Sequence, residues 1–539
     1  MKKRPNIIIF NPDEMRLDTM SHMGNPAAVT PFLDEFAQNE AVSFRNAYCQ
    51  NPVCVPSRCS FFTGLYPHVQ GHRTMAYLLR PGESSLFSEL KKNGYHVWMN
   101  SRNDLHAAQY EGWLEENADE IFYGGNTKPA PGTVIENVRG DMSSKNYYSH
   151  FGGELKLDEN GKNYTRDDEA VDALIERIKN PVDDKPLLGF VGLMYPHTPY
   201  QIEEPYYSAI DRSKLPERIK AGDCTGKPKM EQRLRDLIHM QEYSEADWDE
   251  LRAVYLGMCM KVDDQFRRVC EALKEAGIYD DTAIFFLSDH GDFDGDYDLP
   301  EKAQNCFEDC LTKVPLLVKP PKGIDVDPGI SDSLVELVDF YATAMDFAEA
   351  ESDHTHFGRS LRPILKDRSE KIRDHVFCEG GRMPGEEHCD ESHINGPAGS
   401  PPSFVYWPRQ TAQREDDTHL KGTMIFDGRY KYIMRQDDSD EFYDLQIDPR
   451  EMTNRIHDGA YAGEIIRLER QMLKWYQATC DIVPLDFDAR FNKEMLWSML
   501  KFNCKDDEES KLLHDAIWNG CFKMPLLMEI LRKHRQNKQ

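Results

Sequence analysis

The sequence lacks the patterns that mark several classes of protein. Its thirteen cysteines include no Cys-x-x-Cys pair, and their odd number argues against a disulfide framework or a structural zinc site. Basic residues are in deficit, with 65 lysines and arginines against 93 aspartates and glutamates, so the formal charge is −28. Such a charge disfavours nucleic acid or an anionic membrane as the main partner. An anionic substrate would therefore need a local cationic pocket.

Long apolar runs are also missing. After the basic N-terminal residues, the first apolar run covers only Ile7 to Phe10, which is too short for a signal peptide core or a membrane span. We therefore expect a cytoplasmic location, unless a leader has been removed. The 539 residues contain no internal repeat and no low-complexity segment. This length allows one large domain with a smaller one, or two or three equal domains, and a hydrophobic content of 40% is enough for a sizeable core.

Four short apolar runs are present, and each ends in polar residues. Continuous β-branched and aromatic runs of this length predict strands buried on both faces, hence a parallel sheet with helices on each side. A helix is predicted from Ser244 to Gly277. The fold class is therefore α/β, with a doubly wound, mostly parallel sheet that binds ligands beyond the carboxyl ends of its strands. The polar residues that follow the runs are Asp13 and Glu14; Arg102, Asn103 and Asp104; His197; and Asp289 and His290.

The pattern changes after about residue 370. "TMIFDGRYKYIMR" alternates around Asp427-Gly428, which predicts a hairpin, and an amphipathic helix follows through Ile465–Leu473. We expect an α/β catalytic domain over residues 1–370, a smaller antiparallel-sheet subdomain over 371–485 and a helical tail over 486–539. The segments Tyr123–Gly153 and Gly380–Ser403 are expected to be long loops that contribute to specificity.

Hard oxygen donors dominate the polar residues at the predicted strand ends. Asp13 and Asp289, with Glu14 as a further candidate, suit Ca²⁺, Mg²⁺ or Mn²⁺, and His290 leaves Zn²⁺ open. Each pair taken alone also fits a simple turn at the end of a strand. Since Asp13 and Asp289 follow equivalent strands, the sequence favours a metal site.

Three cations and one histidine lie near these motifs. Arg58, Arg102 and Lys302 would hold an anionic tetrahedral group opposite a metal. For Lys302 the sequence by itself favours a solvated surface charge. His197 lies between two prolines in "YPHTPY" and fits either a leaving-group acid or a structural turn histidine.

The stretch "CQNPVCVPSRCSFFTGLYPH" raises the question of what Cys54 does. A disulfide, a zinc ligand and a thiol nucleophile are open readings. "CVPSR", followed by "TGLYPH", resembles the signature of the type I sulfatases, formylglycine-dependent enzymes of the alkaline phosphatase superfamily. The resemblance continues through "PNIIIFNPDEMRLD", "GYHVWMNSRNDL", "YPHTPY", "LSDHGD", "GRYKYI" and "FYDLQIDPREMTN", to about residue 480. It implies an alkaline-phosphatase-like sheet and a sulfuric ester hydrolase.

In that family, a maturation enzyme reads Cys-x-Pro-x-Arg and oxidises the cysteine to formylglycine. Cys54, Pro56 and Arg58 supply this pattern. The hydrated aldehyde carries two hydroxyls on one carbon, so that one attacks sulfur and the other later expels sulfate as the carbonyl re-forms. A thiol or a serine lacks this second step.

The resemblance also implies a role for each remaining site residue. A divalent metal, calcium first with Mn²⁺, Mg²⁺ or Zn²⁺ open, would be held by Asp13, Cys54, Asp289 and His290. The implied catalytic residues are Cys54 itself, Arg58, Arg102 and Lys302 around the sulfate, His197 as the leaving-group acid and Asp104 as the base.

This sequence departs from the common family pattern at two places. "SRND" stands where many members have Gly-Lys-x-His, so Arg102 keeps the charge while Asp104 replaces a histidine. In the metal motif, Glu14 replaces a frequent aspartate and His290 a frequent asparagine. The Asp-His pair resembles the choline sulfatase and phosphonate monoester hydrolase branches.

Three functions follow as hypotheses. The first is hydrolysis of a sulfate monoester of a saccharide or a small alcohol. The alternative is hydrolysis of a phosphonate monoester or phosphodiester at the same site, and the third is a non-catalytic binding protein that kept the fold. The implied partners are the ester and the maturation enzyme, with no nucleic acid or membrane. The apolar tail predicts either a homo-oligomer or packing on its own domain.

Overall fold

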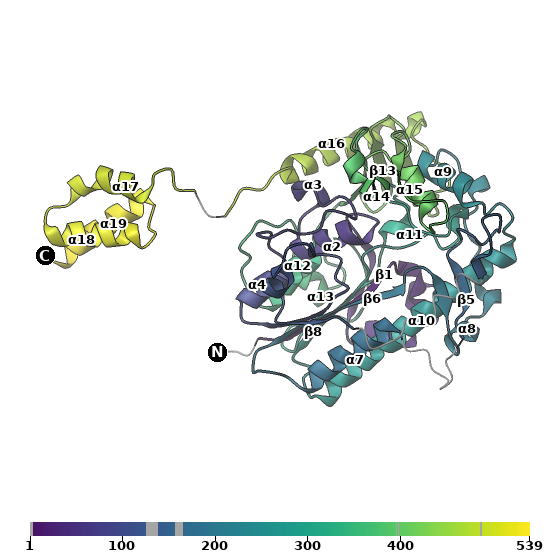
Figure 1. The fold of residues 1–539 in the computed structure, drawn as a ribbon, viewed down its shortest axis with the longest axis horizontal. Helices are drawn as coiled ribbons and strands as arrows, with labels where there is room; N and C mark the ends of the chain where they lie inside the picture. The colour runs from purple at the N-terminus through teal and green to yellow at the C-terminus, as the bar shows by residue number, and fades with distance from the viewer. Residues whose placement is uncertain are drawn as a thin grey trace. The chain divides into compact units, whose positions relative to one another are not determined.

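The computed structural model describes residues 4–124, 138–156, 165–394, 396, 398–485 and 488–538. The chain forms two compact units, Met1–Ile482 and Val483–Gln539 (Figure 1). The domain boundary expected near residue 370 lies inside the first unit and stays a prediction. Among the described residues, none of the helices combines the length and the apolar character that crossing a membrane requires.

A mixed, mostly parallel sheet of eight strands organises the first unit. Its spatial order is β10-β2-β9-β8-β1-β6-β3-β4, and β9 runs antiparallel to both of its neighbours. The predicted α/β class is therefore confirmed. The strands are β1 (Asn6–Asp13), β2 (Val42–Tyr48), β3 (His96–Asn100), β4 (Glu120–Phe122), β6 (Leu187–Pro196), β8 (Thr282–Leu287), β9 (Leu316–Lys319) and β10 (Gly329–Glu336).

Both faces of this sheet are buried, which explains the continuous apolar runs. Successive residues of a strand point to opposite faces, so Ile8 and Phe10 contribute to one core while Ile7 and Ile9 contribute to the other. Helices cover each face, with α7 and α10 on one side and α2, α4, α12 and α13 on the other (Figure 1). These helices are α2 (Cys54–Thr63), α4 (Leu86–Lys92), α7 (Arg166–Lys179), α10 (Glu245–Glu275), α12 (Val338–Phe347) and α13 (Arg362–Lys366).

Helix α10 matches its predicted range closely. Ser244 caps it with a hydrogen bond from the backbone N–H of Asp247, and the Asp247 side chain returns the contact in a capping box. Gly277 follows its end at a φ of 70°, a conformation that glycine adopts without strain. The shorter elements of this unit are α1 (Pro31–Asn39), α3 (Pro67–Gln70), α5 (Trp113–Asn117), β5 (Phe151–Glu154), β7 (Tyr200–Ile202), α8 (Tyr206–Ala209), α9 (Lys229–Ile238), α11 (Asp309–Thr312), α14 (Glu391–Ile394) and α15 (Trp407–Arg414).

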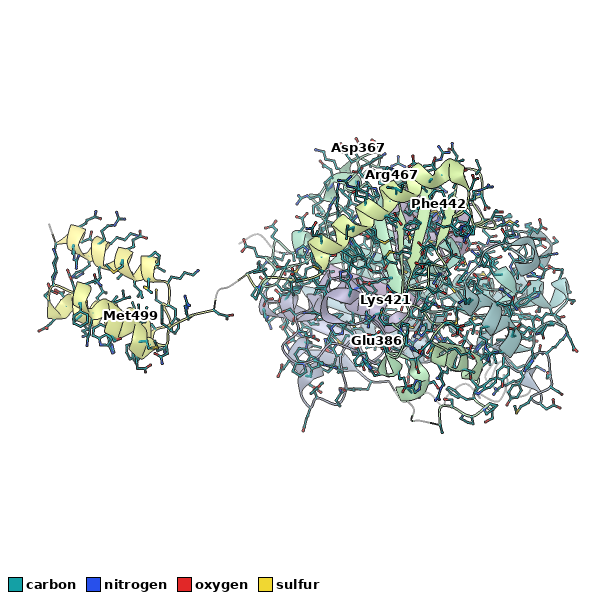
Figure 2. All side chains as sticks on the ribbon, turned by 90° about the horizontal axis from the view of Figure 1, so that it is seen from above. Asp367, Glu386, Lys421, Phe442, Arg467 and Met499 are labelled. Atoms are coloured by element: carbon teal, nitrogen blue, oxygen red, sulfur yellow. The ribbon has the colours of Figure 1, made fainter. Side chains whose placement is uncertain are left out.

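A second, antiparallel sheet confirms the hairpin predicted at Asp427-Gly428. It consists of β11 (Val376–Gly380), β12 (Gly422–Phe426), β13 (Tyr430–Arg435) and β14 (Glu441–Asp444). Helix α16 (Ala462–Thr479) lies along this sheet in Figure 2 and buries Leu468 and Met472 against Phe442. Ile466 and Leu473, expected on the apolar side of this helix, are instead 64% and 69% exposed.

The unit Val483–Gln539 has its own small core. Its helices are α17 (Lys493–Leu500), α18 (Asp507–Trp518) and α19 (Met524–Asn537). Leu496, Leu500, Leu513, Leu527 and Leu531 are buried together inside it. The predicted helical character of the tail is confirmed.

Candidate active site

The polar residues predicted at four strand ends meet at one edge of the large sheet. Asp13 ends β1, Arg102 and Asp104 follow β3, His197 follows β6, and Asp289 follows β8. Strands β3, β6, β1 and β8 are neighbours in the sheet and run parallel, so their carboxyl ends come together. This juxtaposition is the one that the apolar runs predict.

Helix α2 brings Cys54 and Arg58 to this edge. Cys54 is its first residue, so the side chain lies at the positive end of the helix dipole. Arg58 follows one turn later and is completely buried. The Cys54 Sγ lies 3.6 Å from Asp13 Oδ1 and 3.4 Å from His290 Nε2.

Arg58 holds the two aspartates in place. Its Nε donates to Asp289 Oδ2 at 2.8 Å, and its Nη2 donates to Asp13 Oδ2 at 2.9 Å. Its Nη1 lies 3.4 Å from Asp104 Oδ2. All three nitrogens are thus engaged by protein acceptors, which makes Arg58 a positioning residue for the carboxylates.

The donor set fits a divalent cation. Asp13, Cys54, Asp289 and His290 each present a ligand atom, and these four atoms lie within 4.8 Å of one another. The contact of 2.8 Å between His290 Nδ1 and the Gly291 carbonyl makes Nδ1 the donor, so the lone pair of Nε2 faces the cluster. Two carboxylates and one imidazole suit Ca²⁺, Mn²⁺, Mg²⁺ or Zn²⁺.

The local charges also favour a bound cation. Burial alone would raise the pKa of Asp13, but the guanidinium groups of Arg58 and Arg102 hold it well below its usual range. Burial raises the pKa of the Cys54 thiol well above its usual range, and the Asp13 carboxylate adds to this effect. The site therefore keeps its Asp13 carboxylate charged, as a metal ligand must be.

Glu14 lies on the other side of Asp13 and meets Lys302 and His197. Lys302 Nζ donates to Glu14 Oε2 at 2.7 Å, and His197 Nε2 lies 3.4 Å from the same oxygen. Glu14 Oε1 is buried and has no hydrogen-bond partner among the described residues. Glu14 groups with Asp13 and His197 rather than with the Asp289–His290 pair.

Lys302 is not the solvated surface charge that the sequence by itself favours. Its side chain is only 2% exposed and pairs with Glu14, the residue that follows β1. Burial would lower the pKa of Lys302, but the Glu14 carboxylate raises it well above its ordinary value, so the ammonium stays charged. His197 donates from Nδ1 to the Thr198 carbonyl at 2.9 Å, which leaves its Nε2 facing the site.

The site opens toward Arg102 and Asp104. Their side chains are 25% and 32% exposed, whereas those of Asp13, Asp289 and His290 are fully buried. Arg102 Nη2 donates to Asp13 Oδ2 at 2.6 Å and its Nε donates to the Leu193 carbonyl at 3.0 Å. Its Nη1 donates no hydrogen bond to any residue in the described part of the chain, so this group is available to a ligand.

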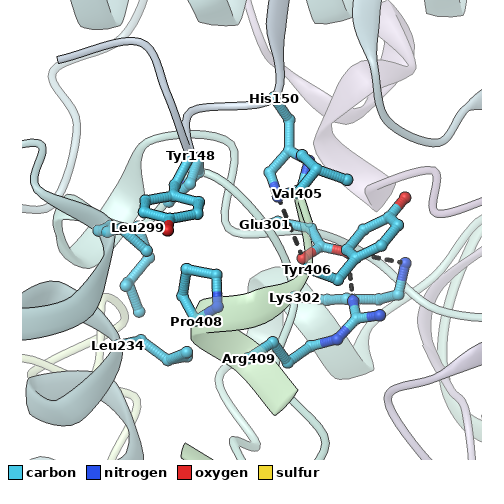
Figure 3. A pocket seen from close by; sticks show the side chains of 12 residues that line it. Tyr148, His150, Leu234, Leu299, Glu301, Lys302, Val405, Tyr406, Pro408 and Arg409 are labelled. Carbon is cyan, nitrogen blue, oxygen red and sulfur yellow. Dashed lines mark hydrogen bonds and ion pairs between the residues drawn. The ribbon is translucent and has the colours of Figure 1, made fainter. Parts of the chain in front are cut away.

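Further buried residues contact Lys302 through Glu301. Figure 3 shows His150, Lys302 and Arg409 converging on the carboxylate of Glu301. Tyr406 lies beside them, and its hydroxyl is 3.1 Å from Thr198 Oγ1, next to His197. None of these residues stands out in the sequence by a motif. Glu301 could have been noticed beside Lys302, but no local pattern marks residues that come from α15.

The two predicted loops reach the site only in part. Residues 125–137 of Tyr123–Gly153 lie outside the described residues, while Tyr123 and Gly124 line a groove next to Arg102. Within Gly380–Ser403 the chain forms the short helix α14, where Glu391 Oε2 accepts from Arg409 Nη2 at 3.1 Å. The pocket of Figure 3 is lined by Tyr148 and His150 from the first segment, whereas its lining residues near the second segment begin only after it, at Val405.

Comparison with known proteins agrees with this arrangement. The family model described as Sulfatase matches residues 5–350. The arylsulfatase of Clostridium perfringens is 24% identical over 502 residues, which cover 87% of this chain and 94% of that protein. A multifunctional alkaline phosphatase superfamily protein of Trinickia caryophylli is 26% identical over 523 residues, 89% and 96% of the two chains.

Solved structures share the fold. The crystal structure of a phosphonate monoester hydrolase of Agrobacterium radiobacter superposes with a TM-score of 0.67 at 20% identity, covering 89% of this chain and 97% of that one. The resemblance stated from the motifs is therefore confirmed at the level of fold and family. Since the family model spans more than half of the sequence, this chain belongs to the Sulfatase family, enzymes of the alkaline phosphatase superfamily that hydrolyse sulfate esters.

Proposed function

We propose that this protein hydrolyses a sulfate monoester with residue 54 converted from cysteine to formylglycine beside a divalent cation, calcium foremost. The observation that carries the proposal is the convergence of Asp13, Cys54, Asp289 and His290 within 4.8 Å, at the start of α2. The Cys54 Sγ stands where the oxygen atoms of the modified residue would lie. The pattern Cys54-x-Pro56-x-Arg58 supports recognition by a maturation enzyme.

The chain's own residues would bind and orient the ester. When bound, a divalent cation in this cluster would polarise a sulfate oxygen and lower the pKa of a hydroxyl on residue 54. Arg102 Nη1 supplies positive charge at the open side of the site, and the ammonium of Lys302 supplies it in the buried part, beside Glu14. Arg58 holds Asp13 and Asp289, and the complete burial of these groups keeps water from competing for their charges.

Two residues are assigned to proton transfer. His197 donates from Nδ1 to the Thr198 carbonyl, so its Nε2 carries a proton only in the imidazolium form. We assign this form, protonated from solvent as the anionic ester binds, to give the Nε2 proton to the departing alcohol oxygen. We assign Asp104 to accept the proton of the hydroxyl that remains on residue 54, since its carboxylate is exposed at the open side and lies 3.4 Å from Arg58 Nη1.

Hydrolysis of a phosphonate monoester or a phosphodiester is the alternative. Such esters also carry a single negative charge at the reacting centre, and the Asp289–His290 pair resembles the metal motif of that branch. The charge balance suits either monoanion, since a dianionic phosphate monoester would call for more positive charge than Arg102 and Lys302 provide.

The test uses protein produced together with a formylglycine-generating enzyme. We expect an intact mass about 18 Da below that of the thiol form. We also expect hydrolysis of 4-nitrophenyl sulfate at least tenfold more efficient than that of a matched phenylphosphonate or bis-nitrophenyl phosphate. Cys54→Ala should retain the fold and lose the activity.

Each other result has a defined meaning. A preference for the phosphonate or the diester would replace the proposal with its alternative. If the aldehyde-bearing protein hydrolyses none of the three esters in the presence of calcium or manganese, this would support the hypothesis of a non-catalytic binding protein. Full activity in Cys54→Ala would refute a covalent role for residue 54.

A further inference from the structure

A groove begins where the candidate active site opens. It lies at the carboxyl ends of β3, β4 and β6 and shares Arg102 and Asp104 with the site. Phe122, which ends β4, and Tyr123, which follows it, also line the groove. Met194 of β6 and Arg166 at the start of α7 line it as well. An ester bound at Arg102 would therefore extend its alcohol part into this groove.

Two apolar side chains that line the groove are exposed to solvent, and the packing of the fold does not require this exposure. Met194 is 39% exposed, while the other nine residues of β6 are buried. Tyr123, which also lines the groove, is 64% exposed. A thioether and an aromatic ring that line the same groove offer contact to a flat ring with an apolar face, either aryl or saccharide.

The charge on the groove is provided by Arg166. Its side chain is exposed, and within the described residues it has no hydrogen bond or ion pair. The neighbouring carboxylate of Asp167 does not pair with it, because this carboxylate accepts the backbone N–H groups of Met194 and Tyr195 at 2.8 to 3.0 Å. The helix dipole disfavours a cation at position N1, where the positive end of the dipole lies. Arg166 therefore gains nothing from its own helix.

We propose that this groove binds the alcohol part of the substrate, and that the alcohol is ring-shaped and carries a second anionic group. The ring would lie between Tyr123 and Met194, and the anionic group would pair with Arg166. This inference rests on the proposed sulfatase activity and names the substrate class for it. Arg166 would be a specificity residue that does not touch the reacting sulfur.

A matched pair of esters tests the inference: the sulfate of 4-hydroxybenzoate and the sulfate of its methyl ester. The two share a ring and differ in the second negative charge. For the native protein we expect the carboxylate to have the lower KM. In Arg166→Gln, the KM of the carboxylate should rise about tenfold, as for loss of one charge-assisted pair, with kcat unchanged. The KM of the methyl ester should change less than twofold.

Two further variants separate binding from folding. Tyr123→Ala should raise the KM of both esters without changing their ratio. Arg470→Gln, an equal loss of charge on the exposed face of α16, should change neither KM. The Tm of Arg166→Gln should equal or exceed that of the native protein, because the variant removes a cation from the start of a helix.

The results distinguish between an error in the proposed role of the groove and an error in the proposed sulfatase activity. If the native protein hydrolyses neither ester, the proposed sulfatase function fails. If it hydrolyses both and Arg166→Gln changes the two KM values equally or not at all, only the assignment of the second anionic group is overturned. If Tyr123→Ala leaves both KM values unchanged, the ring site is overturned.

Discussion

At the scale of single residues, the candidate site depends on one buried guanidinium. Arg58 reaches Asp13, Asp289 and Asp104 from three nitrogens, with Nε and Nη2 aimed at different carboxylates. A planar fork can serve acceptors on several sides, whereas an ammonium on a flexible stem places its charge at one point. The distance between Asp13 and Asp289 is therefore set by the shape of Arg58 as well as by its charge.

We expect Arg58→Lys to inactivate the protein even though it preserves the charge. Loss of the fork leaves one carboxylate buried and unpaired. Breaking a buried ion pair in this way lowers the free energy of unfolding by about 3–5 kcal/mol. Misplacement of the ligands by about 1 Å should lower kcat/KM roughly 100-fold. Steady-state kinetics, a calcium titration and thermal unfolding would measure the three effects.

The control for this variant is Arg45→Lys. Arg45 pairs with Asp332 at 2.8 Å, but the side chains are 43% and 79% exposed, so the exchange should be nearly neutral. Equal activity in Arg58→Lys and the native protein would show that charge alone suffices at position 58.

At the scale of elements, the end of β6 is packed closely against the loop after β3. Asn100 bridges the two, since its side chain donates to the Gly192 carbonyl at 2.8 Å and accepts from the Gly192 N–H at 2.9 Å. A Cβ at position 192 would lie only 2.4 Å from the carbonyl oxygen of Arg102. Glycine at this position lets the loop that carries Arg102 and Asp104 approach the sheet.

Gly192→Ala, a substitution within the sheet, should therefore displace the loop that carries Arg102 and Asp104. The added methyl group would push the Arg102 backbone away, and we expect a fall in kcat/KM of about 10- to 100-fold with a loss of about 1–3 kcal/mol in stability. Kinetics with 4-nitrophenyl sulfate and urea unfolding would measure both.

Gly463→Ala is the matched substitution. A Cβ at Gly463 meets no atom within 4 Å, and the residue lies in α16, where alanine is favoured by about 0.5–1 kcal/mol. It should leave activity intact. If Gly192→Ala were as harmless, the close approach would not matter for the position of Arg102.

At the scale of the whole molecule, the large unit buries several histidines in neutral form. Burial lowers the pKa of His106 and of His150 to about 4 and that of His419 to about 3. In the unfolded chain each would titrate near pH 6.5. Because the unfolded state binds more protons between pH 6.5 and 4, the stability contributed above pH 6.5 is lost as the pH falls through this range.

We expect the protein to lose stability steadily from pH 6.5 to pH 4, and His106→Phe to reduce that loss. His106 lies between the rings of Phe87 and Trp113, so a phenyl ring is compatible with its surroundings. One histidine accounts for up to about 1.4 kcal/mol per pH unit. The difference between the urea midpoints of variant and native protein should grow in favour of the variant as the pH falls.

The exposed His388 serves as the control, and His388→Gln should leave the pH dependence unchanged. A pH dependence that is the same in His106→Phe and the native protein would mean that position 106 does not contribute protons on unfolding.

The residues that end the strands, and therefore meet at one edge of the sheet, can be predicted from the sequence. Apolar runs such as Ile7–Phe10 require burial on both faces, and this requirement alone leads to a parallel sheet with Asp13 and Asp289 at the same edge. The Cys54 motif and the hairpin at Asp427-Gly428 are likewise local patterns that can be read along the chain.

The partners of these residues, in contrast, depend on how the chain packs in three dimensions. The contact of Lys302 with Glu14 joins residues 288 positions apart, and the contact of Arg409 with Glu301 joins residues 108 apart. The side on which the site opens, and the position of Arg166 beside it, depend in the same way on how distant segments pack. Such contacts arise from packing in three dimensions, and neither the hydrophobic period nor any local motif encodes them.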